Sequence, residues 1–122
     1  MDKAEQAVQL HQQGCNCCQA VLMSCCEEFG LDREKASRLG AYFGGGMRAG
    51  EVCGAVTGGL MTLGLHSGDA HNRQNTCSTA FLKAFQSEFG TLLCREILAK
   101  HQKQLCPTLI AWVTKYMEDN CK

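Results

Sequence analysis

The spacing of apolar residues along the chain predicts short helices and no strands. Apolar residues recur every three or four positions, as in a helix that buries one face, and no stretch keeps the period of two that marks a strand. The predicted helices span 2–12, 17–29, 32–41, 51–65, 92–101 and 106 onward, with another that is capped by Asp69 or Asn72 and ends at Phe89. We therefore expect an all-α fold, a compact bundle of six to seven short helices around a central glycine-rich helix.

The central helix follows a glycine loop and carries glycine where a helix normally carries side chains. Gly54, Gly58 and Gly59 lie in this segment, with Cys53 at its mouth. Glycine costs about 1 kcal/mol relative to alanine inside a helix, so we expect each of these positions to allow a close approach. The approaching group is either another helix or something held by Cys53, and the cysteine content favours the second.

Length and charge limit the classes of protein that the chain can belong to. Its 122 residues form a single domain, 1–122, and 45% of them are apolar, enough to bury a core without disulfides. Lys plus Arg, 12, equals Asp plus Glu, 12, so no basic footprint points to nucleic acid or to an anionic membrane surface. There is no run of about 18 apolar residues and no apolar signal region at the polar N-terminus. We predict a cytoplasmic protein with no nucleic-acid partner and no membrane partner.

The ten cysteines carry the main chemical signal. A reducing cytosol disfavours a disulfide scaffold and favours metal, cluster or redox chemistry, although about half of the ten are expected only to pack as small apolar side chains. Four of them lie at predicted helix starts: Cys17, Cys53, Cys94 and Cys106. We call these the helix-start cysteines. Helix N-termini present free N–H groups and the positive end of the helix dipole, which both stabilise a thiolate.

Other residues were weighed for the same chemistry. Cys106-Pro107 is a weak iron–sulfur signal, because a ligand cysteine followed by proline recurs in such proteins. Cys15 and Cys18 flank Cys17, and either could replace it. We assign packing, boundary or adventitious roles to Cys25, Cys26, Cys77 and Cys121, and surface positions to His11, His66, His71 and His101. Phe81, Phe85 and Phe89 recur every four residues and are expected in the core or a subunit interface.

Several familiar motifs are absent from the sequence. The C-x-x-C at 15–18 lacks the βαβ context of a thioredoxin-like site, and no C-x-x-C-H motif for haem attachment occurs. No paired zinc-finger spacing is present, and the Gly-Gly-Gly run lacks the lysine of a phosphate-binding loop. We also find no acid–base pair placed for catalysis, which favours a redox carrier or metal-binding protein over an enzyme.

The chain resembles the C_GCAxxG_C_C family of small bacterial and archaeal redox-active proteins over about residues 4–117. The resemblance is carried by residues 14–21, 44–65 and 89–95 and by Cys106. It implies that the helix-start cysteines are the four cysteines of the family's name, and that the protein is helical and a homodimer. A related domain in split-Soret cytochromes accompanies an iron–sulfur centre, which implies that this set could hold a cluster. One departure is that the family reads Gly-Cys-Ala where this chain reads Cys53-Gly54-Ala55, and a shift by one position turns a helical side chain by about 100°.

The leading hypothesis is a small redox protein whose Cys17, Cys53, Cys94 and Cys106 bind an iron–sulfur cluster for electron transfer with a redox partner protein. The alternative is a metal-free thiol–disulfide protein that uses the same cysteines. A zinc-binding or purely structural helical module is the third possibility, because ligand type alone does not separate zinc from iron–sulfur.

Overall fold

The computed structural model of the chain describes residues 1–68 and 76–121, and it confirms the all-α fold. Within these ranges the backbone forms seven α-helices: α1 (Lys3–Gln12), α2 (Cys17–Cys25), α3 (Arg33–Gly40), α4 (Gly54–Ser67), α5 (Cys77–Phe89), α6 (Cys94–His101) and α7 (Cys106–Asn120). Three shorter turns, η1 (Glu27–Phe29), η2 (Gly46–Gly50) and η3 (Gln102–Leu105), complete the helical structure of this part. None of the described helices is long and apolar enough to cross a membrane.

Local side-chain caps set the helix starts that the sequence predicts. The Asn16 side chain accepts a hydrogen bond from the Gln19 N–H, and the Gln19 Oε1 accepts one from the Asn16 N–H, so α2 begins with a capping box. Asp32 caps α3 through the Lys35 N–H at 2.8 Å. The expected cap of α5 at Asp69 or Asn72 lies outside the described residues, and the described helix begins at Cys77.

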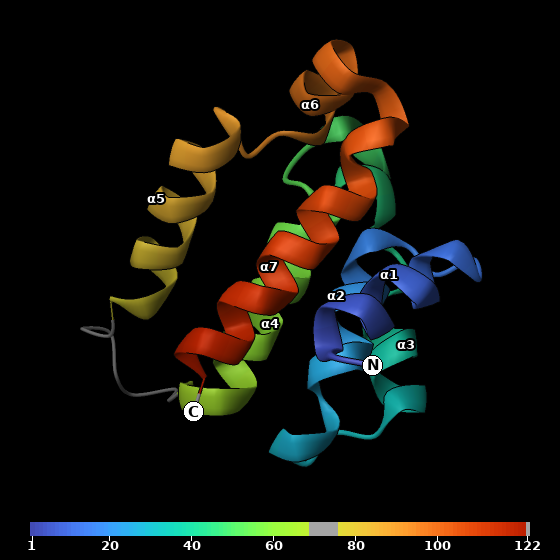
Figure 1. The fold of residues 1–122 in the computed structure, drawn as a ribbon, viewed down its shortest axis with the longest axis vertical. Helices are drawn as coiled ribbons and strands as arrows, with labels where there is room; N and C mark the ends of the chain where they lie inside the picture. The colour runs from blue at the N-terminus through green and yellow to red at the C-terminus, as the bar shows by residue number, and fades with distance from the viewer. Residues whose placement is uncertain (69–75, 122) are drawn as a thin grey trace.

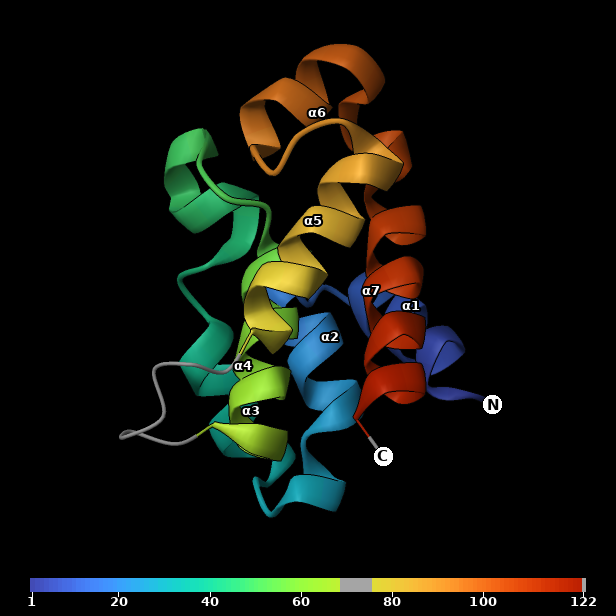
Figure 2. The same ribbon diagram turned by 90° about the vertical axis from the view of Figure 1, so that its left-hand side faces the viewer.

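Three helices share one direction and build the core. In Figures 1 and 2, α2, α4 and α7 begin toward the end of the molecule where α6 lies and run away from it. Between them lies one main cluster of buried apolar side chains, with Val21, Val56, Phe85 and Ile110 fully buried. The aromatic row of α5 belongs to this core, because Phe81 contacts Tyr116 of α7 and both Phe85 and Phe89 contact Trp112.

Gly58 and Gly59 of α4 allow other helices to approach. The sequence analysis had favoured a group held by Cys53 as the approaching object, and the structure corrects this expectation for these two positions. A Cβ atom on Gly58 would lie 2.8 Å from the Cys18 carbonyl oxygen of α2. A Cβ atom on Gly59 would lie 2.7 Å from the Phe81 ring of α5. Both positions therefore serve helix packing, the first of the two alternatives.

The predicted starts of two helices, at residues 51 and 92, are wrong, because the backbone of these two segments forms hydrogen bonds between them instead of within a helix. The Cys53 N–H donates to the Leu92 carbonyl at 2.8 Å, and the Cys94 N–H donates to the Glu51 carbonyl at 2.7 Å. These bonds flank an antiparallel bridge between Val52 and Leu93. As a result, α4 begins at Gly54 rather than residue 51, and α6 begins at Cys94 rather than residue 92.

Candidate functional site

The helix-start cysteines surround one cavity of about 230 Å³. They come from α2, α6 and α7 and from the residue that precedes α4. The remaining lining residues are His11, Asn16, Gly45, Gly54, Ile97, Leu98 and Leu109. Residues spread over most of the chain thus meet at one place, and the lining combines four thiols with apolar walls.

Each helix-start cysteine lies at a helix N-terminus, as the sequence predicts. Cys17, Cys94 and Cys106 are the first residues of α2, α6 and α7. Cys53 is the N-cap of α4 and makes no cap hydrogen bond through its sulfur, although the nearby N–H groups of Ala55 and Val56 act to lower the pKa of its thiol.

The bridge and the glycine loop position Cys53 and Cys94. The Val52–Leu93 bridge holds the two backbone segments that carry Cys53 and Cys94 next to each other. Gly46 packs against this bridge with a φ of 67°, and a Cβ atom there would lie 2.5 Å from the Glu51 carbonyl oxygen and 2.8 Å from the Cys94 Cβ. Only glycine combines this left-handed backbone with so close a contact.

Every pair among the helix-start cysteines interacts electrostatically. Cys17 and Cys106 share a hydrogen bond, which is the largest reason that the pKa of Cys17 is raised, followed by burial and the other thiols. Burial raises the pKa of Cys53 to about 11, against the lowering effect of the Ala55 and Val56 N–H groups, and burial also raises the pKa of Cys94. The expected thiolate stabilisation at helix starts is present at Cys53, but burial outweighs it.

The arrangement does not converge on a single point. Within the described residues, no group of three or more His, Cys, Asp or Glu side chains is arranged to hold a metal ion. A tetrahedral zinc site needs four sulfurs about 2.3 Å from one ion, whereas the thiolates of an iron–sulfur cluster bind different irons and stand farther apart. The structure therefore brings four thiols to one cavity without a preformed single-ion site, and soft sulfur donors are the ligands that both zinc and iron–sulfur clusters take.

Cys15 and Cys18, the possible substitutes for Cys17, face other parts of the molecule. The Cys18 sulfur is buried and lies 3.9 Å from the Met61 sulfur, while the Cys15 sulfur lies 4.0 Å from the Met23 sulfur. Neither residue belongs to the described lining of the cavity. Of the three neighbours in sequence, Cys17 is the one that the fold directs toward the other helix-start cysteines.

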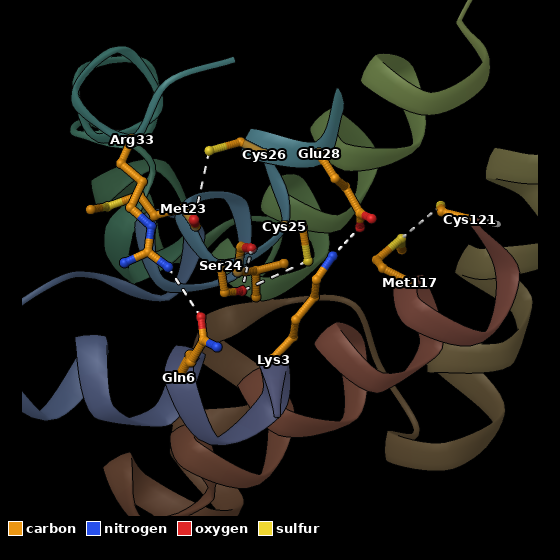
Figure 3. A network of polar contacts seen from close by, with 11 residues as sticks. Lys3, Gln6, Met23, Ser24, Cys25, Cys26, Glu28, Arg33, Met117 and Cys121 are labelled. Atoms are coloured by element: carbon orange, nitrogen blue, oxygen red, sulfur yellow. Dashed lines mark hydrogen bonds and ion pairs between the residues drawn. The ribbon is translucent and has the colours of Figure 1, made fainter. Parts of the chain in front are cut away.

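Of the cysteines assigned other roles, Cys25 and Cys26 lie at the C-terminal end of α2 and Cys121 follows the C-terminal end of α7 (Figure 3). The Cys25 sulfur lies 3.7 Å from the Ser24 hydroxyl, the Cys26 thiol donates to the Met23 carbonyl at 3.6 Å, and the Cys121 sulfur lies 4.0 Å from the Met117 sulfur. All three cysteines are buried, whereas Cys77 is exposed at the start of α5. The packing role predicted for the buried three fits their surroundings.

Two of the histidines that were expected at the surface are half-buried, and one of them lines the cavity. His11 is half-buried and lines the cavity, and its Nδ1 donates to the Cys15 carbonyl at 2.9 Å. His66 is also half-buried, with its ring against Phe29, whereas His101 is exposed and His71 lies outside the described residues. The sequence held one signal for the position of His11. It lies in the last turn of a predicted helix, and the chain after Gly14 can turn back so that the Cys15 carbonyl meets the ring.

Taken together, these features define a cysteine-rich helical protein with a four-thiol cavity at one end. The chain belongs to the family described as "Putative redox-active protein (C_GCAxxG_C_C)", whose model matches residues 15–120, and the resemblance noted from the sequence is thereby confirmed. No curated protein and no solved structure matches the chain.

Proposed function

We propose that the protein is an electron carrier in which Cys17, Cys53, Cys94 and Cys106 hold an iron–sulfur cluster. The observation that carries the proposal is that these four thiols, from four separate parts of the chain, line one cavity. A bound cluster supplies one-electron oxidation and reduction. The four cysteines would ligate it, and the apolar side chains of Ile97, Leu98 and Leu109 would line its surroundings.

Cluster binding must displace protons from the cavity thiols. Burial and mutual repulsion raise the pKa values of Cys17, Cys53 and Cys94, so these thiols stay protonated near neutral pH when nothing positive is bound. Metal ions displace thiol protons and offset the repulsion among thiolates. The N–H groups of Ala55 and Val56 lie at the start of α4 and favour negative charge on the Cys53 sulfur, and such backbone groups are one of the ways in which a protein tunes a cluster potential.

A second function has one specific observation in its favour, the hydrogen bond between Cys17 and Cys106. Two thiols in contact can form a disulfide by giving two protons and two electrons to a partner disulfide, which becomes a dithiol. Both functions need a thiolate, which the raised pKa of Cys17 opposes, but a disulfide between Cys17 and Cys106 leaves Cys53 and Cys94 without a role. We therefore rank the thiol–disulfide function below the cluster, and a zinc module below both.

The test is anaerobic purification, followed by a visible absorption spectrum and analysis of iron, sulfide and zinc. The proposal expects a brown protein in which iron and sulfide are present in near-equal amounts. A colourless protein that stays colourless after incubation with iron and sulfide contradicts it. Zinc in place of iron would indicate the zinc module, and a metal-free protein with rapidly oxidised thiols would indicate the disulfide function.

The homodimer and the redox partner protein remain predictions. Sedimentation at several protein concentrations measures the first, and pull-down of a reduced or oxidised electron carrier measures the second.

A further inference from the structure

A groove of about 560 Å³ lies on α3 and on the turn that follows it. Its lining residues are Leu31, Lys35, Arg38, Leu39, Ala41 and Tyr42. Leu39 and Tyr42 are 56% and 73% exposed, unusually high for large apolar side chains in a protein that buries its other aromatic rings at least in part. The groove therefore offers an apolar floor that the described part of the chain leaves open to solvent.

The charged groups at this groove are basic. Lys35 and Arg38 line it, and the Arg48 guanidinium lies 5.1 Å from the centre of the Tyr42 ring. Asp32 lies 4.0 Å from Lys35, a long contact between exposed side chains, while Arg38 and Arg48 form no ion pair within the described residues. Because the whole chain has a formal net charge of zero, this cluster is a local excess of positive charge.

The groove adjoins the wall of the four-thiol cavity. Asn16, which lines the cavity, donates from its side-chain amide to the carbonyls of Gly40 and Ala41 at the end of α3. Gly45, another lining residue, follows Tyr42 by three residues, so their Cα atoms lie at most about 11 Å apart. Figure 2 shows this stretch between α3 and α4, coloured teal to green, along one edge of the molecule.

We propose that this groove is the docking surface for a small one-electron carrier with an acidic surface. Complexes between redox proteins use small interfaces, and charge complementarity guides their encounter. Here the exposed Leu39 and Tyr42 provide the apolar contact, and Lys35, Arg38 and Arg48 select an acidic rim. Because electron transfer falls steeply with distance, a partner bound beside the cavity wall is well placed to exchange electrons. The inference deepens the proposed function and rests on it for this last step.

The test is a titration of the isotopically labelled protein with flavodoxin, an acidic flavin carrier, followed by NMR, with basic cytochrome c as the opposite probe. We expect flavodoxin to shift the amide signals of 38–48, and its affinity to fall as salt concentration rises. Arg38→Glu should weaken binding at least about tenfold, because it reverses a charge at the rim. Lys83→Glu, an equal charge reversal at an exposed position of α5, should leave binding unchanged.

Tyr42→Ala supplies a second, uncharged variant at an exposed position, which should fold normally and bind flavodoxin more weakly. Stronger binding of cytochrome c, equal losses in Arg38→Glu and Lys83→Glu, or shifts elsewhere on the molecule would overturn the proposal. Self-association that Tyr42→Ala abolishes would also overturn it, because the groove would then be a dimer interface. Iron and sulfide analysis of the titrated protein separates the two claims. A protein that binds flavodoxin but takes up no iron and sulfide contradicts the proposed function alone. A protein that holds a cluster but does not bind flavodoxin contradicts the groove alone.

Discussion

The two ends of α2 and α7 carry the same residue type in different chemical settings. At the N-terminal ends, Cys17 and Cys106 share a hydrogen bond beside a cavity that two further cysteines line. At the C-terminal ends, Cys25 and Cys121 are 2% and 7% exposed in the apolar core. Helix starts present N–H donors that suit a thiolate or a metal-bound sulfur, whereas helix ends present carbonyls that suit a protonated thiol. A helix start that also lines the cavity distinguishes a candidate ligand, because Cys77 begins α5 as well but is exposed and does not belong to the lining.

The largest difference between the two ends should appear in metal content. Cys106→Ser removes a thiol from the cavity and should lower the iron and sulfide per chain by about tenfold or more, because a ligand is lost. Cys121→Ser changes the other end of the same helix and should keep the full metal content despite some loss of stability. Iron and sulfide analysis after anaerobic reconstitution measures both. Equal metal loss in the two variants would remove the distinction between the ends.

Two glycines near the opposite ends of α4 should differ in how much a substitution changes the free energy of unfolding. Gly46→Ala places a Cβ 2.5 Å from the Glu51 carbonyl oxygen on a left-handed backbone, and we expect a loss of about 2 kcal/mol or more in the free energy of unfolding. Gly64→Ala, toward the other end of α4, meets nothing within 4 Å and should stabilise by up to about 1 kcal/mol. Urea denaturation of both variants measures the difference, and a destabilised Gly64→Ala would show that the far end of α4 is as tightly constrained.

The stability of the protein at alkaline pH should report on Cys25, at the C-terminal end of α2. Burial raises the pKa of Cys25 from 9.0 to about 11, so the folded state holds this proton more tightly than the unfolded state. Its contribution to stability is fully present below about pH 9 and is lost as the pH rises toward about 11, by up to about 1.4 kcal/mol per pH unit. Metal-free, reduced Cys25→Ala should therefore lose less stability over this window than the parent chain, whereas Cys77→Ala at an exposed position should behave like the parent. An unchanged pH dependence in Cys25→Ala would refute this.

The smallest expected effect concerns His11. Its ring lines the cavity with Nδ1 bonded to Cys15, so His11→Ala should shift the reduction potential or absorption spectrum of the loaded protein while leaving its iron content intact. His101→Ala, on an exposed position of α6, serves as the control. Redox titration followed by absorption distinguishes them. Identical curves for the two variants would place His11 outside the influence of the site.

Local signals account for what the sequence predicts correctly. The apolar period and the caps at Asn16 and Asp32 act within a few residues of chain, and the positions of the helix-start cysteines follow from them. The exact starts of α4 and α6 could not be predicted, because the Val52–Leu93 bridge joins segments far apart in sequence.

The convergence of the cysteines and the place of His11 depend on tertiary structure in the same way. The sequence near Cys17 contains no signal that predicts its contact with Cys106 of α7. The glycines of α4 gave a correct signal of close approach and a wrong preference for what approaches, because local sequence does not identify the Cys18 carbonyl or the Phe81 ring as the neighbour.

The most direct test of the central claim is thiol alkylation under native anaerobic conditions, read by mass spectrometry before and after loading with iron and sulfide. Cys15, Cys17, Cys94 and Cys106 are all half-buried, and Cys77 is exposed. The account predicts that loading protects Cys17, Cys94 and Cys106, whereas Cys15 and Cys77 react at the same rate in both states. Unchanged reactivity of Cys94 and Cys106 after loading, or protection of Cys15 in place of Cys17, would contradict it.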